Sequence, residues 1–106
     1  MSLYTEADIR RWQRSAALAL AGLLKRAADA ELPAISWTVL TGRELHGAVQ
    51  CRDGDRRDLF EFWRQHLGLT ERKPGRSLGV LRLCAYGEFD GVRVALTADI
   101  YEDDEQ

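Results

Sequence analysis

Histidine, cysteine and aspartate are the residues of this chain most able to do chemistry, and their spacing limits which chemistry is open to them. His46 and His66 are the only histidines. A zinc site requires further His, Cys or carboxylate ligands at spacings such as H-x-x-x-H or C-x-x-C, which the sequence lacks. Cys51 and Cys84 lie in apolar runs, with no predicted helix N-terminus beside them to activate a thiolate. We therefore expect neither a metal site nor a Cys–His nucleophile.

The segment DGDRRD contains Asp53, Asp55 and Asp58, a spacing that superficially fits a calcium loop. A calcium loop of this type needs ligands over twelve residues and a closing glutamate, whereas this segment leads directly into a helical pattern. A turn followed by a helix cap is the better interpretation. The chain also has no G-x-S-x-G elbow and no carboxylate pair suited to acid–base work. We predict that the protein is not an enzyme and uses no cofactor.

Two glycine-bearing segments, TGRELHG and YGEFDG, could be taken for phosphate-binding loops. A phosphate loop runs from a strand into a helix N-terminus. Here a second strand pattern follows each segment, so we interpret both as turns between paired strands, where glycine permits positive φ.

Length and composition favour one folded domain. The chain has 106 residues, of which 45% are hydrophobic and 30% charged, an ordinary globular mixture. Four of the seventeen acidic residues lie at positions 102–105, so the rest of the chain is slightly basic. We predict a single domain over residues 1–101 and a disordered acidic tail over 102–106.

The apolar run AALALAGLL resembles the core of a secretory signal. Glu6 and Asp8 in the segment before it, and Lys25 and Arg26 directly after it, argue against that interpretation. The run is also shorter than the roughly 20 residues that span a membrane. We expect a core helix, no membrane association and a cytoplasmic location.

Hydrophobic periodicity predicts the elements of the first half. Thr5 and Asp8 form a capping-box pattern, so a helix should begin near Glu6 and end before Pro33. Its apolar stripe recurs every three or four residues, at Ile9, Trp12, Ala16, Ala19, Leu20, Leu23, Ala27 and Ala30. The period then changes to two, which predicts strands over 35–39 and 45–52.

The second half repeats this order. Asp55 is placed to cap a helix that ends at Gly68. The predicted apolar face of that helix consists of Leu59, Phe62, Trp63, His66 and Leu67. We expect His66 to be packed and hydrogen-bonded, and LTERKPGRS to be a polar loop. Strands are predicted over 78–86 and 92–101.

Together these elements predict an α+β two-layer sandwich with the order α-β-β-α-β-β. We expect a four-stranded antiparallel sheet with both helices on one face, burying Trp12, Trp37, Trp63 and one of Phe60 and Phe62 between the layers. In topology this order is similar to a circularly permuted ferredoxin-like fold. The likeness implies a fold and no function.

The face of the sheet without helices is the predicted working surface. Alternation along the strands places polar and aromatic residues on it, and Tyr and Arg are enriched in protein interfaces. The predicted interface residues are His46, Gln50, Arg82, Tyr86, Arg93, Thr97 and Tyr101.

A second candidate surface is a basic rim in the loops that flank the second helix. The rim consists of Arg52, Arg56, Arg57, Arg72, Lys73 and Arg76. Such a rim would bind an anion or a nucleic-acid backbone. Neighbouring acidic residues at 53, 55, 58 and 71 oppose its field, and an ordinary solvated surface is the simpler interpretation.

These observations favour a non-catalytic protein-interaction module that binds a second copy of itself or another protein, through the open sheet face or an edge strand. One alternative is a small nucleic-acid-binding module that uses the basic rim and the sheet-face tyrosines, since aromatic rings on a sheet can stack on bases. Another is a small-molecule-binding protein with a pocket between sheet and helices.

Overall fold

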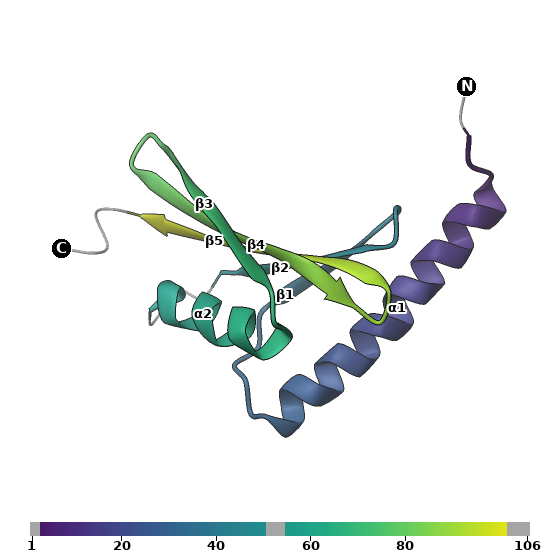
Figure 1. Cartoon of the computed structure of the whole chain (residues 1–106), viewed down its shortest axis with the longest axis horizontal. Coiled ribbons are helices and arrows are strands. Elements are labelled where there is room, and N and C mark those ends of the chain that lie inside the picture. Colours follow the sequence, from purple (N-terminus) through teal and green to yellow (C-terminus); the bar gives the residue numbers. More distant parts are fainter. Residues whose placement is uncertain (1–2, 51–54, 102–106) are drawn as a thin grey trace.

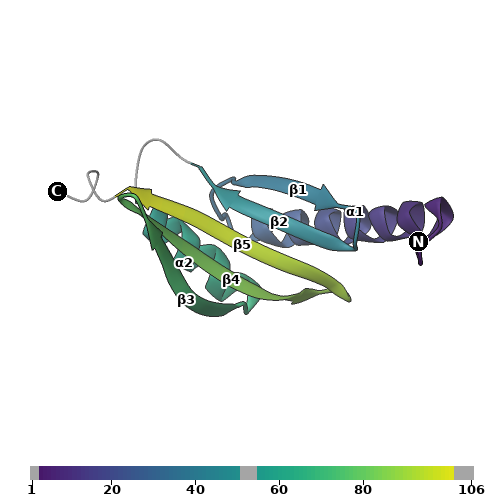
Figure 2. The same cartoon turned by 90° about the horizontal axis from the view of Figure 1, so that it is seen from above.

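The computed structural model describes residues 3–50 and 55–101 and confirms an α+β architecture. The two helices lie on one side of the sheet, below it in Figure 1 and behind it in Figure 2, as predicted. The described elements are α1 (Glu6–Asp29), β1 (Ser36–Leu40), β2 (Glu44–Val49), α2 (Arg56–Leu67), β3 (Thr70–Ser77), β4 (Val80–Phe89) and β5 (Val92–Tyr101).

Local capping chemistry sets the ends of both helices, and all three predicted signals are confirmed. The Thr5 side chain accepts a hydrogen bond from the Asp8 amide, and the Asp8 carboxylate accepts one from the Thr5 amide, which completes the capping box. Asp55 accepts from the amides of Arg57 and Asp58 at the start of α2. Gly68 ends α2 in the left-handed conformation, with φ of 67°.

The sheet is mixed and has five strands in the order β1-β2-β5-β4-β3. The central neighbours β2 and β5 are parallel, with Leu45 opposite Val94 and Val49 opposite Ala98. The other neighbouring strands pair antiparallel. The prediction of four antiparallel strands, and of the permuted ferredoxin-like sheet, is therefore wrong in strand number and in the direction of the central pair.

The additional strand is β3, whose polar sequence predicts a loop. All eight of its residues are exposed, and Pro74 lies beside a register shift between Arg72 and Gly75. This edge strand forms without a pattern of alternating hydrophobic residues, because its backbone pairing with β4 holds it in the sheet. Leu78, which we predicted to begin a strand, is instead fully exposed in the tight turn before Gly79, and both residues have positive φ.

Strand β4 also continues further than predicted. Gly87, Glu88 and Phe89 of the YGEFDG segment pair with β5, which leaves Asp90 and Gly91 as the turn. Both turn residues have positive φ, the conformation that Asp-Gly pairs adopt readily in hairpins.

Two tryptophans fill the space between the helices and the sheet. Trp63 of α2 is buried, donates a hydrogen bond from Nε1 to the Pro33 carbonyl at 2.9 Å, and meets Trp37 of β1 edge-to-face at 5.6 Å. Phe60 is buried with it, whereas Phe62 is 55% exposed, so the predicted apolar face of α2 was wrong at that position. His66 is packed, but its Nε2 has no hydrogen-bond partner among the described residues, which contradicts the predicted bond.

Gly47 of β2 permits Trp37 to lie against the sheet. A Cβ at position 47 would lie 2.9 Å from Cη2 of the Trp37 ring. We predict that Gly47→Ala lowers the free energy of unfolding by about 1–3 kcal/mol, because the indole must leave its packed position.

Urea unfolding followed by tryptophan fluorescence measures this change. Gly42→Ala is the matched control, since a Cβ there meets no atom within 4 Å. Equal destabilisation by the two substitutions would contradict this role for Gly47.

Candidate functional site

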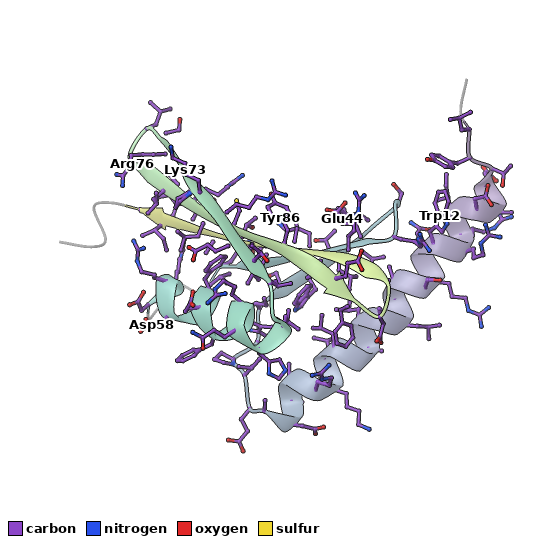
Figure 3. All side chains as sticks on the ribbon, viewed as in Figure 1. Trp12, Glu44, Asp58, Lys73, Arg76 and Tyr86 are labelled. Atoms are coloured by element: carbon purple, nitrogen blue, oxygen red, sulfur yellow. The ribbon has the colours of Figure 1, made fainter. Side chains whose placement is uncertain are left out.

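The outer face of the sheet, turned away from both helices, is the candidate functional site. Strand register places Arg82 opposite Asp99, Tyr86 opposite Ala95, and Ala48 opposite Thr97 on this face. Figure 3 shows Tyr86 and Glu44 rising on the side opposite the helices. The structure brings the predicted interface residues together here: His46, Gln50, Arg82, Tyr86, Arg93, Thr97 and Tyr101.

Two tyrosines of this face are each stacked against an arginine side chain. The guanidinium carbon of Arg72 lies 4.9 Å from the ring centroid of Tyr86, and that of Arg56 lies 5.2 Å from the centroid of Tyr101. Arg56 also donates a hydrogen bond to the Asp99 carbonyl at 2.9 Å. These cation–π contacts hold planar, amphipathic groups at the surface in fixed orientations.

Charges on the outer face alternate in sign. Arg82 donates two hydrogen bonds to the Asp99 carboxylate, at 2.7 and 3.0 Å. These bonds lower the pKa of Asp99 and raise the pKa of Arg82 from their ordinary values. At the other end of the face, Arg93 is the cross-strand neighbour of both Glu44 and Glu88. The positive charges of Arg82 and Arg93 are thus balanced by neighbouring carboxylates.

His46 lies near the centre of the face, one strand from Thr97. Its Nε2 is 3.0 Å from Thr97 Oγ1, and both side chains are half-buried. The His46 ring is therefore held in place by a side-chain hydrogen bond. Such a pair offers polar contacts at a defined position on the face.

The basic rim does not form a separate surface. Arg72 and Arg56 reach the two tyrosines of the outer face, and Arg76 lines the same depression as Tyr101. Lys73 and Arg76 lie on the β3–β4 hairpin (Figure 3). Arg57 lies in the first turn of α2, where its backbone amide donates a hydrogen bond to the capping Asp55, and Arg52 lies outside the described residues. The rim is therefore in large part an extension of the outer face.

The outer face contains shallow depressions. One of about 660 Å³ extends from β2 across β5 and β4 to β3, and is bordered by Glu44, Arg72, Tyr86, Glu88 and Arg93. Another of about 500 Å³ lies near the far end of the sheet, bordered by Arg76, Arg82, Asp99 and Tyr101. Both are open to solvent and suit protruding side chains of a partner.

Sequence reasoning missed three residues of this face. Arg72 belongs to β3, which showed no strand pattern, and Glu88 lies in the segment that we predicted to be a turn. Glu44 begins β2 one residue before the predicted start. For Glu88, the alternation of polar and apolar residues continues past Tyr86 and could have predicted the longer strand. For Arg72, the sequence contains no pattern that predicts a strand.

The described residues contain no group of three or more His, Cys, Asp and Glu side chains arranged to hold a metal ion. Over the same residues, neither helix is long and apolar enough to cross a membrane. Comparison of the chain with models of protein families, with curated proteins and with solved structures finds no match.

The Arg82–Asp99 pair gives a pH-dependent prediction. Because the folded state lowers the pKa of Asp99, its contribution to stability is present above the unfolded value of about 3.9 and is lost as pH falls through the lowered pKa. We predict that Asp99→Asn costs about 0.2–1 kcal/mol at pH 7, the range for partly exposed pairs.

The free energy of unfolding, measured from pH 7 to pH 2 for wild type, Asp99→Asn, Arg82→Gln and the double variant, tests this prediction. The difference between wild type and Asp99→Asn should shrink with acidification, and the double variant should cost less than the two single changes combined. A pH-independent difference would contradict the assignment.

Proposed function

We propose that this protein is a non-catalytic interaction module that binds a protein partner on the outer face of its sheet. The observation that carries the proposal is that none of the described elements covers this face, while Tyr86 and Tyr101 are held on it by stacked arginines. Tyr and Arg dominate the binding energy of many protein interfaces. Because their orientations are fixed before binding, less side-chain entropy is lost when a partner docks.

The pairing of Arg82 and Arg93 with carboxylates supports a protein partner over a nucleic acid. Binding to a phosphate backbone relies on an excess of positive charge. On this face Asp99 accepts both bonds from Arg82, and the carboxylates of Glu44 and Glu88 flank Arg93. This mixture of positive and negative side chains suits the polar rim and the charged pairs of a protein interface.

We also propose that the protein can associate with itself and that it is located in the cytoplasm. The partner on the outer face is either a second copy of the chain or a different protein. Cys84 is a free, half-buried thiol on this face, a state that suits a reducing compartment. The alternative of a nucleic-acid-binding module rests on the stacked Tyr86 and Tyr101, which would also accept bases.

Two substitutions on the outer face test the proposal. We predict that Arg93→Glu combined with Tyr101→Glu lowers the amount of partner captured by the immobilised chain from source-cell extract at least tenfold, because each change removes an interface anchor. Quantitative mass spectrometry of the captured proteins measures the effect. The control is Lys25→Glu combined with Phe62→Glu, which makes matched changes at exposed helix positions.

Proteins captured by wild type and control, and lost from the outer-face variant, would support the proposal. Capture that is equal for all three chains would overturn it. Binding of random-sequence oligonucleotides that weakens steeply with salt, and is abolished by the same two outer-face substitutions, would replace it with the nucleic-acid alternative.

A further inference from the structure

The two edges of the sheet differ in how they are protected against pairing with another strand. The β3 edge carries Lys73, Pro74, two arginines and a register shift, which are devices that block strand addition. The β1 edge has the sequence SWTVL, with no charge, proline or shift. Among the described residues β1 pairs with β2 alone, so its outer backbone groups are available to a second strand.

Helix α1 presents an apolar flank beside this unprotected edge. Ala17, Ala21, Leu24 and Ala28 are all exposed and recur at spacings of four, three and four residues, which aligns them along one side of the helix. This α1 flank lies about a third of a turn from the buried stripe that contains Ala16 and Leu23.

The packing of α1 shows which way the α1 flank points. On the opposite flank of the helix, Arg26 lies over the Phe89 ring at 5.5 Å, and a Cβ on Gly22 would lie 3.8 Å from the same ring. Phe89 belongs to β4, on the far side of β2 and β5 from β1. The α1 flank therefore faces outward past β1, and Figure 2 shows α1 running behind β1 and β2.

We infer that the β1 edge and the α1 flank form the homodimer interface of this protein, with a second copy of the chain as the occupant. A two-fold axis through Thr38 would pair the β1 strands antiparallel and set the two α1 helices side by side in opposite directions. The five sheet strands of each copy then continue into one ten-stranded sheet. The inference goes beyond the proposed function, because this interface leaves the outer face of both copies uncovered.

The sequence is self-complementary in that arrangement. Centring the strands on Thr38 pairs Trp37 of one copy with Val39 of the other, and Thr38 with itself, which are favourable cross-strand pairs. Antiparallel helices that bring Ala21 against Leu24 also bring Arg14 of one copy toward the C-terminal end of the other copy's α1, which Glu31 follows. Both charged side chains are exposed, so the ends of the interface match in charge as well as in shape.

The size of this interface sets the expected affinity. Strand β1 is about 17 Å long at 3.3 Å per residue, and the α1 flank is of similar length at 1.5 Å per residue. A patch of that length and two layers deep, about 20 Å, covers roughly 350 Å² of each copy, or about 700 Å² in total, which is below the roughly 1,200 Å² at which standard interfaces begin and fits a weak, transient dimer. Dissociation in the micromolar range is therefore expected, and measurements should extend from about 1 to 300 μM.

Sedimentation equilibrium of the full chain over this range tests the inference. Leu24→Glu should weaken dimerisation at least tenfold, because two carboxylates would be buried in the helix pair. Leu18→Glu is the control, since Leu18 is 65% exposed on the side of α1 away from the sheet while Leu24 is 44% exposed on the α1 flank. The control should dimerise like wild type.

A second pair of variants tests the strand edge. Thr38→Lys places two like charges opposite each other across the axis and should also dissociate the dimer. Thr70→Lys, the same change on exposed β3, should not. A monomeric wild type at 300 μM, or equal effects within either pair, would overturn the inference. So would dissociation by Arg93→Glu with Tyr101→Glu while Leu24→Glu remains dimeric, and that result would assign self-association to the outer face.

Discussion

The parallel pairing of β2 with β5 is the constraint on which the rest of this structure depends. It joins the β1–β2 hairpin to the β3–β4–β5 meander through buried contacts between Leu45, Val49 and the apolar face of β5. Parallel neighbours need a long crossover connection, and α2 with β3 and β4 supplies it. With β2 and β5 fixed at the centre, β1 and β3 become the two edges, and both helices cover the same face.

One missed strand accounts for most of the difference between the predicted and the observed sheet. A chain that passes from β2 through a helix directly into β4 would make β4 parallel to β2, and β5 would then run antiparallel to β2. Inserting β3 reverses both later strands, so the central pair becomes parallel. Periodicity reveals which face a buried strand presents, but it is silent for an edge strand such as TERKPGRS, whose residues are all exposed.

The outer face was more predictable than the sheet, because alternation assigns faces without knowledge of strand order. Arg82, Tyr86, Arg93 and Thr97 could be grouped from spacing alone, and their register confirms the grouping. The contacts that orient them could not be predicted. Arg72 reaches Tyr86 only because β3 pairs with β4, and Arg56 reaches Tyr101 only because α2 packs beneath the end of β5. Long-range packing sets these contacts.

We propose that the three surfaces created by the β2–β5 pairing have different roles. The β3 edge is closed to strand addition, the β1 edge binds a second copy, and the outer face binds a partner. Amide hydrogen exchange at about 1 and 300 μM tests this division most directly. We predict that exchange over residues 17–28 and 36–40 slows as concentration rises, while exchange over residues 70–77 is the same at both concentrations. Exchange over residues 36–40 that is independent of concentration, or protection that appears in residues 70–77 instead, would contradict it.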